Sequence, residues 1–248
     1  MLIAFLVEQL PFTALLNRLF GGPVAAVADR LGLHVNRHAP IPNYVAMQIL
    51  VVLLLIAFFV WVRSRLSVDR PGGAQHFAEL LHEFISNQSK EIIGHHGYEP
   101  YTPILLSMLC FILLSNLLGL VPGFESPTAS PEVPLGCAVV AFVYYNYHGI
   151  RLNGWRYIKH FIGPVWQLAP LMFLIEVVSH LARMLSLTVR LFANIFAGDM
   201  LTLAFFSLIP IGVPIIFMLL HLGVSLVQAY IFVVLMTVYL GGAVAEEH

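Results

Sequence analysis

Four charged side chains lie inside one long apolar stretch of the sequence. Glu176, Arg183, Arg190 and Asp199 all fall between residues 168 and 208. A charge costs at least about 2.5 kcal/mol at the centre of a membrane-spanning helix, so an ionisable residue there is by default a candidate functional residue. The chemistry that such groups offer is the holding or transfer of ions within a membrane.

The spacing of these charges predicts a polar stripe on one face of a helix. At about 100° per residue, counted from Arg190, the following polar residues fall within about 40° of Arg190: Glu176, Ser179, Arg183, Ser186 and Asn194. Asp199 points about 180° away from this stripe and lies roughly 13 Å further along the helix axis. Asp199 is therefore expected to meet a different environment.

A second polar stripe is predicted in the last apolar stretch, residues 213–242. His221, Ser225 and Gln228 recur there at i, i+4 and i+7, so they share one helix face. An antiparallel pairing of the two stretches would bring His221 to Asp199, and Arg190 would then lie between two aqueous access paths. The alternative interpretation is that the hydroxyl and amide groups serve only as hydrogen bonds between helices, which is common in membrane bundles.

The composition indicates an integral membrane protein. Hydrophobic residues make up 59% and charged residues only 10% of the 248 residues, whereas a soluble domain carries about 25% charged residues. The formal net charge of -1 provides no field that would favour a nucleic acid. Cys110 and Cys137 lie in or beside apolar runs without metal-ligand spacing, so they are expected to be small core residues and a disulfide framework is not expected. No metal site or cofactor is expected either.

The apolar residues cluster in runs long enough to cross a membrane, which takes roughly 20 residues. The predicted elements are spans over residues 44–62, 103–121 and 135–150 and two long helices over 168–208 and 213–242, separated by Pro210 and Pro214. A helix of about 40 residues is about 60 Å long, so the long helices should be strongly tilted. Residues 72–97 show helical amphipathic spacing, which predicts a surface helix. The expected fold is an all-α polytopic helix bundle forming a single membrane domain, with residues 1–43 as its N-terminal tail.

Basic residues beside the spans predict the orientation. Arg63, Arg65 and Arg70 follow the first span and Arg151, Arg156 and Lys159 follow the third, whereas the loop over residues 122–134 contains no cation. By the positive-inside rule the loop faces outward and the C-terminus is cytoplasmic, although Arg18, Arg30 and Arg37 of the tail run against this bias. The first residues lack the basic region of a secretory signal, so cleavage after Ala26-Val27-Ala28 is not expected.

The run LSLTVRLFANIFAGD, from Leu185 to Asp199, closely resembles the signature of subunit a of F-type ATP synthases. Two further segments resemble that family: NLLGLVPG over residues 116–123 with Pro127-Thr128, and residues 221–239. The resemblance extends from about residue 44 to the C-terminus. This sequence has Ala193 where glycine is usual and Asp199 where glutamate is usual, and the shorter aspartate shifts the reach of the carboxylate.

The resemblance implies a non-catalytic stator subunit that lies beside a rotating ring of c subunits, is joined to peripheral-stalk b subunits, and couples proton transport to ATP synthesis. It implies an outer half-channel formed by Asp199, His221, Asn194 and Gln228, an inner half-channel formed by Glu176 and Ser179, and Arg190 facing the ring, with Ser186 on the same polar stripe. A bacterial inner membrane is the expected location. Protons are favoured over sodium as the coupling ion because a sodium path would need additional oxygen ligands.

Other functions that place charges in a membrane fit the sequence less well. An ion-coupled secondary transporter usually shows inverted repeats, and no internal repeat is visible. His82-Glu83 begins like a zinc motif, but Ser86 stands where the second histidine is required. A di-haem cytochrome would find only the pair His180 and His221. A transporter remains the alternative, and it would move ions without a c ring.

Overall fold

The computed structural model describes residues 10–30, 39–68, 70–94, 97–121, 123–154, 169–208 and 212–244. All regular structure in these ranges is helical, which confirms the expected all-α fold. The elements are α2 (Pro11–Arg30), α3 (Asn43–Ser64), α4 (Gly73–Ile93), α5 (Thr102–Leu118), the 3-10 helix η1 (Pro127–Ala129), α6 (Glu132–Asn153), α8 (Ala169–Leu208) and α9 (Val213–Val244). Several residues named above lie outside the described ranges: Arg37, Pro122, Arg156, Lys159 and Pro210.

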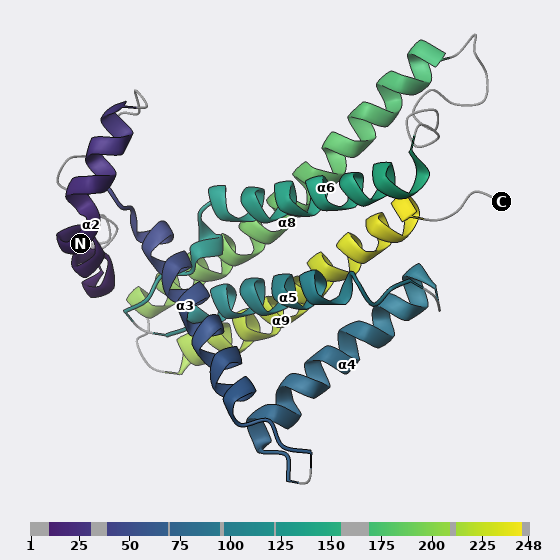
Figure 1. Ribbon diagram of the computed structural model, residues 1–248. Helices are drawn as coiled ribbons and strands as arrows, with labels where there is room; N and C mark the ends of the chain where they lie inside the picture. The colour runs from purple at the N-terminus through teal and green to yellow at the C-terminus, as the bar shows by residue number, and fades with distance from the viewer. Residues whose placement is uncertain are drawn as a thin grey trace.

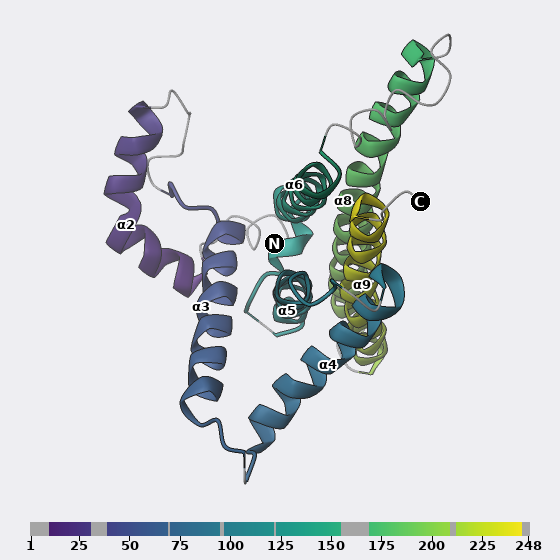
Figure 2. The same ribbon diagram turned by 45° about the vertical axis from the view of Figure 1, so that its right-hand side comes forward.

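The centre of the molecule is a bundle of α5, α6, α8 and α9 (Figure 1). The longest contact is between α8 and α9, and both helices also pack against α6. On the other side of α9 lies α4, which leads back to the end of α3 (Figure 2). At the margin α3 contacts α5 and η1, and α2 packs against α3 (Figure 2). The bundle is therefore built around the two C-terminal helices that carry the candidate residues.

Both C-terminal helices are longer than a perpendicular membrane crossing requires. They contain 40 and 32 residues, or about 60 Å and 48 Å of helix against about 30 Å of hydrocarbon. Pro214 stands in the first turn of α9, where its missing N–H removes no helical hydrogen bond. By length and composition, α3, α8 and α9 could each cross a membrane, and α5 is a shorter apolar helix. These features agree with a polytopic membrane fold.

The core is a seam in which α8 and α9 meet α5 and α6. Side chains four residues apart on each long helix are at most 4% exposed: Leu187, Leu191 and Ile195 on α8, and Phe232, Met236 and Leu240 on α9. Buried small residues on α6 allow its backbone to approach closely, as is typical of membrane helix pairs: Cys137, Ala138 and Ala141. This dry seam fixes the orientation of α8 about its long axis and therefore the directions in which its polar side chains point.

The N-terminal tail contains a helix that the sequence did not predict. Gly21, Gly22 and Pro23 lie inside α2, and because of their low helix propensity the sequence of this segment does not indicate a helix. Asn17 attaches this helix to the segment before α3, because its side chain accepts a hydrogen bond from the N–H of Ile41 at 2.9 Å and donates one to the carbonyl of Ile41 at 3.0 Å.

The amphipathic helix α4 packs against the bundle through one face. Ile85 and Ser89 are buried, and the hydroxyl of Tyr230 on α9 donates to Oε1 of Gln88 at 3.0 Å. Gly94, with φ of 116°, stands where α4 ends. Phe77 and Leu80 remain exposed on α4. The location of α4 on the membrane surface stays a prediction, and these two apolar side chains would then contact the lipid.

Candidate functional site

The antiparallel pairing of α8 and α9 brings the two polar stripes together. Asp199 lies opposite His221, Asn194 opposite Gln228, and Arg183 opposite Tyr239. Partner numbers rise along α9 as they fall along α8, so a single register accounts for the three contacts. The candidate residues consequently lie at successive levels of one helix pair.

At the level nearest the α8–α9 connection, an aspartate and a histidine meet. Oδ1 of Asp199 is 3.5 Å from Nδ1 of His221, whose side chain is almost completely buried. Gly198 makes this approach possible, because a Cβ there would lie 2.9 Å from Nδ1 and 3.1 Å from Cγ of the same ring. The proximity that the helical spacing indicated is present, and its role in proton transfer is taken up below.

A buried polar network lies one turn of α9 from His221, where Ser225 meets α5 and the loop before α6. The hydroxyl of Thr128 donates to Oδ1 of Asn116 at 2.6 Å, and the Asn116 amide donates to the carbonyl of Ser225 at 3.3 Å. Nε2 of His221 and the hydroxyl of Ser225 are buried without a hydrogen-bond partner among the described residues. Such buried polar atoms are ordinarily satisfied by ordered water, so the geometry suits a wet path beside Asp199.

Glu125 lies in the loop that leads to this network. Partial burial raises the pKa of its carboxyl group, and a hydrogen bond with the side chain of Asn43 opposes that shift. The neighbouring helix η1 packs against α8. An acidic side chain is thus held on the same side of the bundle as Asp199 and His221.

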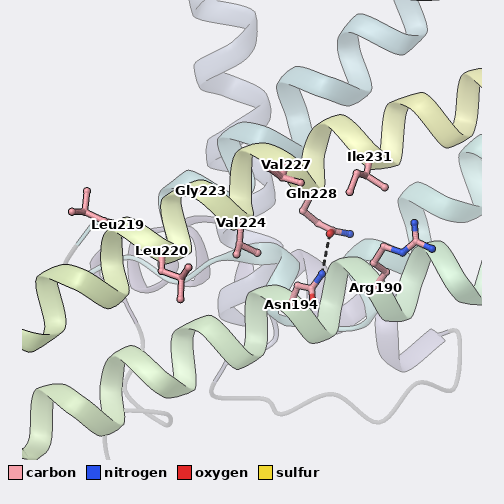
Figure 3. A pocket seen from close by; sticks show the side chains of 9 residues that line it. All are labelled: Arg190, Asn194, Leu219, Leu220, Gly223, Val224, Val227, Gln228 and Ile231. Atoms are coloured by element: carbon pink, nitrogen blue, oxygen red, sulfur yellow. Dashed lines mark hydrogen bonds between the residues drawn. The ribbon is translucent and has the colours of Figure 1, made fainter.

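Arg190 lies in an open groove between α8 and α9 (Figure 3). Its Nη2 is 3.4 Å from the hydroxyl of Ser186, and one turn further the amide of Asn194 donates to Oε1 of Gln228 at 2.9 Å. The groove has a volume of about 610 Å³ and is otherwise lined mainly by apolar side chains and Gly223 of α9: Leu219, Leu220, Val224, Val227 and Ile231. No acidic side chain pairs with Arg190 among the described residues. The guanidinium therefore faces an apolar groove without a counter-charge from the described chain.

The opposite half of α8 carries a second acid–histidine pair. Oε1 of Glu176 is 3.2 Å from Nε2 of His180, and Nδ1 of this histidine is 2.9 Å from the hydroxyl of Tyr145 on α6. Ser179 is half-buried beside them. Arg183 does not join Glu176, because its guanidinium lies over the ring of Tyr239, 5.3 Å from the ring centroid.

Neither His180 nor Tyr145 is predicted to be a functional residue from the sequence. Ten residues before Arg190, His180 falls at about 80° on the helical wheel, close to Leu191 at about 100°. That position on the apolar seam is the signal that predicts its burial. The partner Tyr145, 35 residues earlier on α6, has no such signal in the spacing of α8.

No group of three or more metal-binding side chains occurs among the described residues. The arrangement consists of acid–histidine pairs, hydroxyls, amides and two arginines; acids and histidines can exchange protons, and permanently charged arginines set the local potential.

Comparison with known proteins decides the family of the chain. The model of the family described as "ATP synthase A chain" matches residues 45–241. The chain belongs to this family. It is 57% identical to ATP synthase subunit a of Koribacter versatilis over 97% of this chain and 99% of that protein. It is also 52% identical to subunit a of Solibacter usitatus over 84% of this chain and 90% of that protein, and 40% identical to subunit a of Geobacter sulfurreducens over 81% and 86%.

Membership of the ATP synthase A chain family agrees with the apolar helices and confirms the resemblance in the signature run. The chain is a membrane component that serves proton transport and ATP synthesis.

Proposed function

We propose that this chain is the stator of the proton-driven rotary motor and that Arg190 faces a rotating ring of c subunits. The observation that carries the proposal is the guanidinium in the α8–α9 groove, which has no acidic partner among the described residues. A bare cation in a membrane is costly unless it meets an opposite charge. A carboxylate carried past the groove by another chain supplies that charge.

In this proposal Arg190 acts as an electrostatic gate. A guanidinium stays protonated at any accessible pH, so it cannot itself relay a proton. A carboxylic acid on the ring that approaches Arg190 is driven to ionise, since a nearby cation lowers carboxyl pKa values by roughly 1–3 units. After passing Arg190, the carboxylate must be reprotonated before it meets lipid, where a bare charge is costly.

Two half-channels exchange these protons with opposite sides of the membrane. Asp199, His221, Asn194 and Gln228 form the outer one, supported by the buried polar network around His221. Glu176 and Ser179 form the inner one. Along α8, Arg190 lies about 13 Å from the level of Asp199 and about 21 Å from that of Glu176, so it separates the two half-channels. Each charge that crosses gains about 2.3 kcal/mol per 100 mV, and this energy drives rotation.

The orientation and partners follow from the same reasoning. The α3 end with Arg63, Arg65 and Arg70, the α6 end and the C-terminus face the cytoplasm of a bacterium, and the loop that carries Glu125 faces outward. The chain itself is not an enzyme; the c ring and the peripheral-stalk b subunits are its partners. Protons are the coupling ion, and the surrounding lipid covers the exposed apolar surfaces that the ring does not.

The decisive experiment replaces Arg190 by alanine. We expect Arg190→Ala to abolish ATP-driven proton pumping in inverted membrane vesicles while the complex still assembles, because the ring carboxylate loses its counter-charge. Arg190→Lys should fail largely as well, since an ammonium is more strongly hydrated and can lose its proton when desolvated.

Arg183→Ala is the matched control, because it removes another arginine of the polar stripe, one that lies over Tyr239. It should keep most of the pumping activity per assembled complex. Normal pumping by Arg190→Ala would refute the gate. Ion flux by the chain reconstituted without a c ring would indicate a transporter instead.

A further inference from the structure

His180 is held between a phenol and a carboxylate where α6 meets α8. It is 7% exposed, and its two ring nitrogens lie 2.9 Å from the hydroxyl of Tyr145 and 3.2 Å from Oε1 of Glu176. The imidazole stacks on the ring of Tyr145 at an interplanar angle of 24° and meets Phe142 edge-on at 81°. Two hydrogen-bonding groups and two rings therefore fix both the position and the plane of this histidine.

The chemistry of these partners allows the imidazole to change its protonation state without moving. A phenol oxygen can donate a hydrogen bond to a bare Nδ1 or accept one from Nδ1–H. A carboxyl group can likewise face either a bare or a protonated Nε2. Neutral and protonated His180 are both satisfied, whereas a purely structural histidine needs partners for only one form.

The arginine on the same helix lies over a tyrosine ring and does not pair with Glu176. Arg183, on the same helix, is directed over the ring of Tyr239 on α9. Tyr239 in turn contacts the ring of Tyr145 on α6, with centroids 6.1 Å apart. Among the described residues, His180 is the ion-pair partner of Glu176.

We propose that His180, fixed by Tyr145, positions the carboxylate of Glu176 and exchanges its proton at the inner half-channel. This inference rests on the proposed function of Glu176. When Glu176 receives a proton, its O–H bond breaks and an N–H bond forms at Nε2 of His180, which leaves a carboxylate beside an imidazolium. The proton returns to Glu176, whose side chain is 28% exposed against 9% for His180, and leaves from there, so the pair is restored. His180 therefore both positions the carboxylate of Glu176 and holds its proton for part of the exchange.

The test compares His180→Gln and Tyr145→Phe with the parent in inverted vesicles that contain equal amounts of assembled complex. ATP-driven pumping is measured while the pH of the external buffer, which bathes the cytoplasmic face of inverted vesicles, is varied from about 6 to 8.5, where imidazole changes charge. We expect His180→Gln to reduce the rate on the order of tenfold, less than the full 10²–10⁴ of a proton-transfer group because Glu176 remains. The variant should also lose the pH-dependent step near neutrality.

Tyr145→Phe keeps the ring stacking and removes the hydroxyl, so it should lower the rate and alter the same pH-dependent step. The matched control is Tyr144→Phe, because Tyr144 lies next in the sequence and contacts Tyr101 and His148. This control should keep the parental rate and pH profile. The double variant His180→Gln with Glu176→Gln should pump only slightly more slowly than Glu176→Gln alone, since both substitutions affect the same step.

The proposal is overturned if His180→Gln and Tyr145→Phe change only the amount of complex and leave the rate per complex and the pH profile unchanged. It is also overturned if the fold reductions in pumping rate caused by His180→Gln and Glu176→Gln multiply in the double variant. These outcomes leave Arg190 as the gate untouched, whereas normal pumping by Arg190→Ala would refute the proposed function and not the pairing of His180 with Glu176.

Discussion

A methyl group at position 198 would meet the imidazole ring of His221. In Gly198→Ala the new Cβ would lie 2.9 Å from Nδ1, 3.1 Å from Cγ and 3.2 Å from Cε1 of that ring. Carbon atoms in favourable contact are about 3.5–4.0 Å apart, so the ring must move by roughly 0.5–1 Å. Because the Nδ1–Oδ1 distance to Asp199 is already 3.5 Å, such a shift removes the direct contact.

The effect on activity should exceed the effect on folding. Overpacking a core costs about 1–3 kcal/mol, and replacing a helical glycine by alanine returns about 1 kcal/mol. The net loss of about 0–2 kcal/mol should leave the chain able to assemble. A misplacement of 1 Å at a reacting group can cost about 10²-fold in rate, so we expect proton pumping to fall by about 10–100-fold.

The assay is ATP-driven proton pumping in inverted vesicles, normalised to assembled complex. Gly136→Ala on α6 is the matched control, because a Cβ at Gly136 meets no heavy atom within 4 Å and the variant changes helix propensity alone. It should pump at the parental rate. If Gly198→Ala also pumps at the parental rate, the geometry of Asp199 and His221 does not limit proton uptake and the reasoning is refuted.

Three further predictions concern the outer half-channel and the orientation of the chain. A cysteine replacing the exposed Phe124 should react with an impermeant reagent from outside, and one replacing the fully exposed Val68 should react from inside; the opposite sidedness would reverse the proposed orientation. Burial raises the pKa of Glu125 above its unfolded value of 4.5, so the folded chain binds the proton more tightly, and stability should fall as pH rises through that pKa; thermal unfolding in detergent should show a smaller fall for Glu125→Gln. Asp199→Asn and His221→Gln should each slow pumping strongly, and the variant that exchanges the two residues should recover part of it; parental rates in both single variants from about pH 6 to 9 would exclude a relay.

Much of α8 could be predicted from the sequence because a single helix fixes its own geometry. The spacing of Arg190, Asn194 and Ser186 defines one face, and nine further residues turn Asp199 to the other side, whatever the neighbours are. The antiparallel partner His221 followed from the short connection between two long apolar stretches. Periodicity and length therefore sufficed for the elements that carry the proposed gate.

Contacts between distant segments could not be derived in this way. The hydrogen bond between Thr128 and Asn116 depends on how η1 lies against α5, and the one between Tyr145 and His180 depends on how α6 lies against α8. Neither the length of a single helix nor the spacing of its polar residues predicts how it packs against other helices. The helix α2 was missed for a local reason, because Gly21, Gly22 and Pro23 lower its helix propensity.

The fixed orientation of α8 about its own axis supplies a physical reason why proton transport is coupled to rotation of the ring in the proposed motor. On the helical wheel the seam residue Leu191 falls at about 100°, between Arg190 at 0° and Asp199 at about 180°. Leu191 and Ile195 are completely buried against the rest of the bundle. At these two levels the polar faces of α8 are therefore separated by aliphatic side chains, which form a dry wall without hydrogen-bonding groups. A proton that reaches Asp199 cannot pass through this wall to Glu176, so under the proposed function its way onward is carriage by the ring past Arg190, and transport without rotation is suppressed by the packing of the seam itself.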